Sequence, residues 1–215
     1  MKMEWKSCFK IGTSLFLLYL CVTYWQSAAN VAGLVLGAAM PLLIGCIIAY
    51  LVNILMSCYE MNELGSFSVI TDGVIFHNTL ASSDYSFMKH GTFEPRPNYF
   101  AVLLWNTLMG TTVYDCGNPD CEGAHVYCHS RRDEKDGCVY LVINNSLKDT
   151  TTVELPKDAE VYSLSGNGDL RSSVAYLNGE ALVIGENNTL PELHGETRGA
   201  GVIELAPGSC AFIVL

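Results

Sequence analysis

The feature that most constrains this chain is an unbroken run of uncharged residues from Ile11 to Tyr59. From Glu60 onward the chain is polar and carries 9 Lys and Arg against 21 Asp and Glu, a net charge of −12. A stretch of roughly 150 residues can bury a sizeable hydrophobic core, so this second part can form a domain of its own. Its acidic charge repels phosphate backbones and argues against nucleic acid as a partner.

The uncharged run predicts two membrane-spanning helices, over about 11–25 and 31–57, joined by a short polar break. A bilayer core about 30 Å thick needs roughly 20 apolar residues in helical form. The three lysines among the first ten residues would hold the N-terminus in the cytoplasm. These features predict a transmembrane hairpin over 1–59, with the lipid bilayer as partner. The expected location is an inner or plasma membrane, with the C-terminal domain in the cytoplasm.

Two other interpretations of the run stay open. A basic start, a short apolar stretch and the small residues Ser27, Ala28 and Ala29 also fit a signal peptide with its cleavage site. The apolar run that resumes at Val31 argues against simple secretion. A hairpin buried in a globular core is the third interpretation, although so long an uncharged stretch disfavours it.

The same run carries an Ala-Tyr-x-x-Asn motif, formed by Ala49, Tyr50 and Asn53, within the sequence VAGLVLGAAMPLLIGCIIAYLVNILMSCYE. In this, residues 1–60 resemble the N-terminus of the autoinducer-2 exporter family of bacterial membrane proteins. The resemblance implies a membrane role for this part. A single Asn in such a helix acts either in the transport pathway or as a hydrogen-bonding contact between helices.

The polar stretch 60–68 (EMNELGSFS) indicates a linker between the two parts. After it, β-branched and aromatic residues predict a buried strand at about 73–79. Apolar residues then repeat at helical spacing over 98–109. A proline just before this segment and Gly110 just after it are typical of the two ends of a helix.

Beyond Gly110 the pattern changes to short apolar segments separated by Gly, Asn and Pro turns. We predict about eight strands, at 124–129, 138–144, 150–155, 159–164, 172–177, 181–184, 201–205 and 210–215. Short strands at such regular intervals indicate an antiparallel β-sandwich over 111–215. The last segment, SCAFIVL, is apolar nearly throughout and predicts a central or closing strand.

Motifs in this second part carry a further resemblance. They are VIFHNTLASSDYSFM (74–88), TFEPRPNYFAVLLWNTLMGTTV (92–113) and, in the last strand, ELAPGSCAFIVL (204–215). Residues 69–215 resemble the C-terminal part of glycoside hydrolase family 79, the heparanase and β-glucuronidase-like enzymes. The resemblance implies that 69–110 is a remnant of a (β/α)₈ barrel, its last strand and helix. The expected fold class is therefore α+β: a transmembrane helical hairpin, the barrel remnant, then an antiparallel β-sandwich.

The resemblance implies a retaining hydrolase, whose chemistry needs two carboxylates about 5–5.5 Å apart. The family carries both catalytic glutamates on barrel strands that precede the one found here, and neither has a counterpart in this sequence. We therefore expect no catalytic residue, no glycosidase activity and no cofactor. Glu94 aligns with nothing catalytic and is better explained as a carboxylate near the start of a helix, where the dipole favours it.

Four residues are the candidate substrate-binding set, namely Tyr85, Asp84, Asn78 and His77. The resemblance places Tyr85 on a loop lining the sugar subsites, although this chain has Ser83-Asp84 where the family has glycine and asparagine. The same resemblance places the His77-Asn78 pair at the strand end, and it implies a uronic-acid-containing glycan as ligand. The alternatives are that Tyr85 packs on the barrel rim and that His77 and Asn78 are simply buried with their hydrogen bonds satisfied.

Nine cysteines cannot all pair with one another. Cys116 and Cys121 are separated by four residues. Three states of this pair remain open: free structural thiols, a disulfide or a pair of metal ligands. No recognised zinc-binding set is present, so we expect no metal. Thiols within the predicted strands suggest a reducing compartment.

The leading functional hypothesis is a membrane-tethered, catalytically incomplete fragment of a family 79-like glycoside hydrolase, as a fusion or assembly product would be. A membrane-anchored carbohydrate-binding or interaction module is the first alternative. A truncated transporter-like membrane protein with an unrelated tail is the second.

Overall fold

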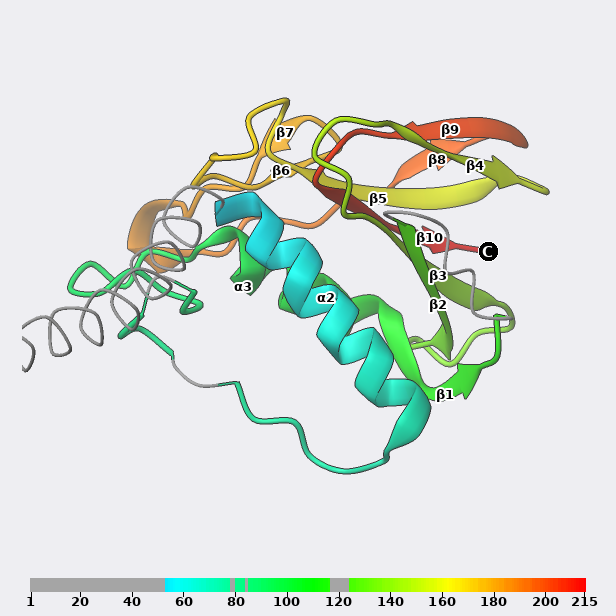
Figure 1. Ribbon diagram of the computed structural model, residues 1–215, viewed down its shortest axis with the longest axis horizontal. Coiled ribbons are helices and arrows are strands. Elements are labelled where there is room, and N and C mark those ends of the chain that lie inside the picture. Colours follow the sequence, from blue (N-terminus) through cyan, green and yellow to red (C-terminus); the bar gives the residue numbers. More distant parts are fainter. Residues whose placement is uncertain (1–52, 78–79, 84, 117–123) are drawn as a thin grey trace, which may run out of the picture. The chain divides into compact units, whose positions relative to one another are not determined.

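The computed structural model describes residues 53–77, 80–83, 85–116 and 124–215, all within the unit Ala49–Leu215 (Figure 1). This part of the chain is mostly β-sheet with two long helices, α2 (Asn53–Ile70) and α3 (Pro97–Leu108), and a short 3₁₀ helix, η1 (Glu186–Asn188). The strands are β1 (Met109–Tyr114), β2 (Ala124–Arg131), β3 (Cys138–Asn144), β4 (Thr151–Leu155), β5 (Ala159–Ser165), β6 (Tyr176–Leu177), β7 (Glu180–Ala181), β8 (Glu196–Arg198), β9 (Gly201–Leu205) and β10 (Ser209–Val214).

The strands form two antiparallel sheets. The larger sheet has the order β1-β2-β3-β10-β5-β6-β7, with β8 also paired to β5, and the smaller sheet is β4-β9. Every residue of β10 is buried. Its Phe212 lies opposite Leu141 of β3 on one side and Tyr162 of β5 on the other. The C-terminal segment is thus a central strand, as its apolar sequence predicted, because it must be covered on both faces.

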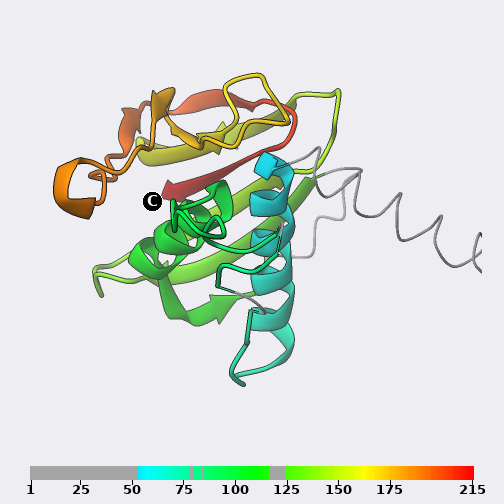
Figure 2. The ribbon, with the colours of Figure 1, turned by 90° about the vertical axis from the view of Figure 1, so that its left-hand side faces the viewer.

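The larger sheet is covered by helices on one face and by β4 and β9 on the other (Figures 1 and 2). Successive side chains of a strand point to opposite faces, and β10 shows this alternation. Phe212 belongs to the core shared with the helices, whereas Ala211 and Ile213 belong to the core shared with the smaller sheet. In that second core they lie with Leu155 of β4 and Leu205 of β9.

Helix α2 buries one face against the sheet. Ile54, Cys58 and Met61 recur at helical spacing and are almost fully buried, so they form the apolar stripe of an amphipathic helix. One turn further on, Gly65 lies against the ring of Tyr127 of β2, and a side chain at this position would collide with that ring. The hydroxyl of Tyr127 donates a hydrogen bond of 2.8 Å to Oδ1 of Asn62. Both contacts hold the helix on β2.

Helix α3 begins at a proline, whose missing N–H group costs nothing in the first turn. It packs against α2 and leads directly into β1. Its buried residues include Phe100, Ala101 and Leu104, spaced as in one face of a helix. The helix predicted over 98–109 is thus confirmed to within one residue at each end.

The expected fold class is wrong in its first part. None of the helices that the structure describes is both long and apolar enough to cross a membrane. Residues 53–57, predicted as the end of a membrane span, form the first turns of α2, and there Ile54 packs in the domain core. A lipid bilayer as partner and a membrane location therefore have no support. The predicted span 11–25 and residues 31–52 lie outside the described residues.

Two further expectations are corrected. The segment 60–68 is helical within α2 rather than a linker, because its apolar residues Met61 and Leu64 face the core among polar neighbours. The predicted barrel strand 73–79 has no strand in its described part, 73–77, where Val74 and Phe76 are 79% and 87% exposed. Without a neighbouring strand the backbone of this segment has no ladder partner to hold it extended in a sheet.

Candidate functional site

The candidate site is centred on His77, which ends the exposed segment that follows α2. Its Nδ1 lies 3.0 Å from Oε2 of Glu60 in α2, and the two side chains are 17% and 8% exposed. The other ring nitrogen, Nε2, is buried and has no hydrogen-bond partner among the residues that the structure describes. Because an unpaired buried polar atom is costly, such an atom needs an explanation. A ligand oxygen that binds it would remove the cost.

Burial is the largest influence on Glu60 and raises the pKa of its carboxyl group above the ordinary value. The charge and hydrogen bond of His77 oppose this rise, and the charge of Glu63 adds to it. When Glu60 is ionised and His77 protonated, Nε2 carries a hydrogen and donates. When His77 is neutral with its hydrogen on Nδ1, Nε2 accepts. The pair can therefore offer either a donor or an acceptor to a ligand.

Two aromatic rings orient the imidazole. The ring of His77 stacks on Phe87 with centroids 4.1 Å apart and an interplanar angle of 21°. It meets Tyr85 edge-on, with centroids 6.2 Å apart. Tyr85 is 41% exposed, so it presents an aromatic surface to solvent beside the imidazole. Such rings can stack on an apolar ligand face while the polar groups beside them fix its orientation.

The loop that carries these rings is held by buried polar side chains. Nδ2 of Asn98, in the first turn of α3, donates a 2.9 Å hydrogen bond to the carbonyl oxygen of Tyr85. Oγ of Ser86 lies 2.6 Å from the carbonyl oxygens of both Ser83 and Met88. Asn98 and Ser86 are 2% and 0% exposed, so the loop is part of the folded core rather than an attachment to it.

The structure brings together two of the four predicted substrate-binding residues, His77 and Tyr85. The other two, Asn78 and Asp84, lie outside the described residues. Sequence reasoning missed Glu60, although it is the first charged residue after the uncharged run. A lone carboxylate on an apolar helix face was the available signal, but no spacing rule joins it to a histidine in a later segment.

Other candidate residues are placed as follows. Glu94 lies before α3 rather than in its first turn, and its Oε2 is 2.7 Å from Nζ of Lys89. The thiol of Cys116 is free, whereas Cys121 lies outside the described residues. In the part of the chain that the structure describes, no group of three or more His, Cys, Asp or Glu could hold a metal ion.

Glu60 is the one acidic side chain buried within the described ranges. Retaining glycoside hydrolysis needs two carboxylates on opposite sides of a bond, and this one is committed to His77. The imidazole and the exposed aromatic surface beside it offer polar and apolar contacts to a ligand.

Curated relatives of the chain are glycosidases and heparanase-like proteins. Baicalin-β-D-glucuronidase from Scutellaria baicalensis is 27% identical over 164 residues, covering 73% of this chain and 31% of the relative. Heparanase-like protein 2 from Arabidopsis thaliana is 28% identical over 199 residues, covering 74% and 36%. Bos taurus heparanase is 28% identical over 169 residues, covering 72% and 31%. The chain is thus similar in sequence to heparanases and related glucuronidases.

The chain spans about a third of the length of these relatives. No family model matches it. Among solved structures, a GH30 endoxylanase from Clostridium papyrosolvens C71 aligns with a TM-score of 0.45 and 10% identity, covering 74% of this chain and 37% of that one. A GH51 arabinofuranosidase from Xanthomonas axonopodis pv. citri aligns with a TM-score of 0.46 and 12% identity, covering 74% and 35%. The resemblance of residues 1–60 to autoinducer-2 exporters is not shown by these comparisons.

Proposed function

We propose that this heparanase-like chain binds a uronic-acid-containing glycan at His77 and Tyr85 and does not hydrolyse it. In this proposal α3 corresponds to the last helix of a hydrolase barrel, and the sheets of 109–214 to the attached sandwich. The observation that carries the proposal is the buried Nε2 of His77, which has no hydrogen-bond partner within the described part of the chain although it stands beside exposed aromatic surface.

The chemistry of a uronic acid fits these groups. A pyranose ring has an apolar C–H face, which an aromatic ring such as Tyr85 can cover. Its carboxylate needs a cationic or hydrogen-bonding donor, and a protonated His77 supplies one at Nε2. Glu60, on the other side of the imidazole, lies 3.0 Å from Nδ1 and helps to hold the ring in this orientation. The names of two relatives, baicalin-β-D-glucuronidase and hyaluronoglucuronidase, specify a glucuronidase, which supports a glucuronic acid unit as the ligand.

The test is a calorimetric or NMR titration of the full chain with methyl β-D-glucuronide, with methyl β-D-glucoside as the neutral comparison. The variant His77→Gln should weaken glucuronide binding by about tenfold or more, because a charge-assisted hydrogen bond is worth roughly 1.5–3 kcal/mol. The variant His194→Gln, at a histidine whose side chain is 75% exposed, should bind as the wild type does. Equal affinities of wild type and His77→Gln would refute the proposed site. Turnover of an aryl glucuronide would refute its non-hydrolytic character.

An exposed apolar segment favours a second candidate function, that of an interaction module. Large apolar side chains are exposed along 69–76, namely Val69, Ile70, Val74, Ile75 and Phe76. Such a contiguous patch marks a surface that another protein element covers. In this second proposal the segment pairs as a strand with further barrel strands of a hydrolase. If a hydrolase barrel is added, slower hydrogen exchange of the amides in 69–76 would support a role as an interaction module. Unchanged exchange rates would exclude this role.

A further inference from the structure

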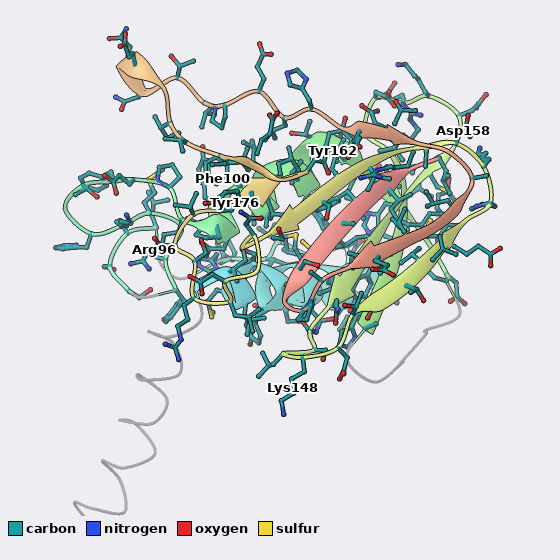
Figure 3. The ribbon with its side chains drawn as sticks, turned by 90° about the horizontal axis from the view of Figure 1, so that it is seen from above. Arg96, Phe100, Lys148, Asp158, Tyr162 and Tyr176 are labelled. Atoms are coloured by element: carbon teal, nitrogen blue, oxygen red, sulfur yellow. The ribbon has the colours of Figure 1, made fainter. Side chains whose placement is uncertain are left out.

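A groove of about 720 Å³ lies beside the start of α3. One wall is the turn 88–95 with the start of α3, and the other is the segment 182–190 around η1; Figure 1 shows these two segments at the same end of the domain, in green and orange. The buried side chain of Phe100, labelled in Figure 3, forms part of its floor.

Phe93 lines this groove in an unfavourable backbone conformation. Its φ angle is +58°, which is rare for a bulky side chain, and the side chain is 62% exposed. The turn is closed by two hydrogen bonds: the N–H of Phe93 donates to the carbonyl of Lys89 at 3.0 Å, and the N–H of Lys89 donates to that of Glu94 at 2.9 Å. Strain of this kind persists where surrounding structure enforces it, and it is concentrated at functional sites. Packing does not explain an aromatic ring that stays largely in solvent.

Polar groups of both kinds stand beside this ring. Nζ of Lys89 and Oε2 of Glu94 are 2.7 Å apart, and their side chains are 41% and 60% exposed. They provide a hydrogen-bond donor and an acceptor side by side, with opposite charges that cancel. Across the groove, Val183 and Leu190 expose apolar surface. An aromatic platform with an adjacent donor and acceptor matches a sugar ring that has an apolar face and neighbouring hydroxyl groups, and the cancelled charge favours an uncharged sugar.

We propose that this groove binds an uncharged pyranose unit of a glycan, with the ring face on Phe93 and the hydroxyls on Lys89 and Glu94. The inference rests on the proposed function, because it makes the groove a further subsite for the glycan whose uronic acid binds at His77. The loop that carries Tyr85 and the stacked ring of the first site continues directly into the groove wall at Met88, so one chain segment serves both sites.

The decisive variant is Phe93→Gly, because it separates a binding role from a structural one. Glycine adopts a positive φ without strain, so the variant should unfold at the same Tm as the wild type or higher. Loss of the aromatic platform should weaken binding of cellobiose, a neutral β-linked disaccharide, by about tenfold. The variant Phe93→Tyr keeps the platform and should bind cellobiose as the wild type does. Leu147→Gly, which removes another exposed apolar side chain from a turn outside the groove, is the matched control and should also bind normally.

Titration with methyl β-D-glucuronide in the same variants distinguishes this inference from the proposed function. Cellobiose binding that is unchanged in Phe93→Gly overturns the groove as a sugar site, as does a wild-type chain that binds the glucuronide but not cellobiose at millimolar concentration. Cellobiose binding that Phe93→Gly weakens, in a chain that does not bind the glucuronide, supports the groove and overturns the His77 site alone. A lowered Tm with normal cellobiose binding assigns Phe93 a purely structural role and overturns the inference.

Discussion

Nε2 of His129 lies 3.1 Å from Oγ of Ser68, and this contact joins the last turns of α2 to β2. The other ring nitrogen, Nδ1, is 2.9 Å from the carbonyl oxygen of Gly110, which can only accept, so Nδ1 donates. Trp105 of α3 meets the imidazole edge-on, with centroids 5.0 Å apart. Four elements of the fold therefore meet at one imidazole that is 3% exposed.

This contact predicts a loss of stability at mildly acidic pH. Burial lowers the pKa of His129 below its ordinary value of 6.5, and the hydrogen bond to Gly110 opposes this only in part. As the pH falls through 6.5, the unfolded chain takes up a proton that the folded chain does not, so the free energy of unfolding decreases. The variant His129→Gln should remove this part of the pH dependence in urea denaturation between about pH 7 and pH 5. An identical slope for wild type and His129→Gln would contradict the prediction.

Glu60 predicts the opposite pH dependence. Burial raises the pKa of Glu60 in the folded chain above its ordinary value of 4.5. Between pH 4.5 and this raised pKa, the folded chain therefore binds more protons than the unfolded chain. Its contribution to the free energy of unfolding is therefore lost as the pH rises through the raised pKa. The variant Glu60→Gln lacks this loss, so its stability relative to the wild type should improve with rising pH. If the difference in free energy of unfolding between wild type and Glu60→Gln does not vary with pH, the carboxyl group of Glu60 has the same pKa in the folded and unfolded chain, and the prediction is wrong.

The close approach of α2 to β2 predicts that Gly65→Ala is destabilising. In an exposed helix position this substitution stabilises by about 1 kcal/mol, because alanine has the higher helix propensity. Here the added methyl group meets the ring of Tyr127, and overpacking of this kind costs about 1–3 kcal/mol. We expect a net decrease in the free energy of unfolding, measured by chemical denaturation. Tyr59→Ala, at an α2 position that is 60% exposed, should change it by less than about 0.5 kcal/mol, and a stabilising Gly65→Ala would show that the helix is not pressed on β2.

Backbone pairing predicts a large contrast in hydrogen exchange. Strand β3 is hydrogen-bonded to β2 on one side and β10 on the other. Segment 73–77 belongs to no strand and is largely exposed. Peptides that cover β3 should therefore exchange far more slowly than peptides that cover 73–77, because the former exchange only on extensive unfolding. Similar protection of the two, measured by mass spectrometry, would mean that the segment is paired in solution.

Elements whose pattern is local can be predicted from the residues alone. Strand β3 and strand β9 have the predicted bounds, because each is a short run rich in β-branched residues that starts at or next to a glycine. Helix α3 was equally readable, since proline and glycine mark its two ends. His77 and Tyr85 were named as candidates through the family resemblance, before any geometry.

Tertiary structure decided what an apolar residue is covered by and which distant groups meet. The sequence pattern of an apolar helix face is the same whether lipid or a sheet covers that face. The pattern therefore did not predict that Ile54 packs in the domain core. The pairing of Glu60 with His77, and the groove between turn 88–95 and segment 182–190, join residues far apart along the chain. Periodicity records which face of an element is apolar, because that preference is a property of each side chain. It does not record the partner of that face, because the partner is set only when the whole core packs at once.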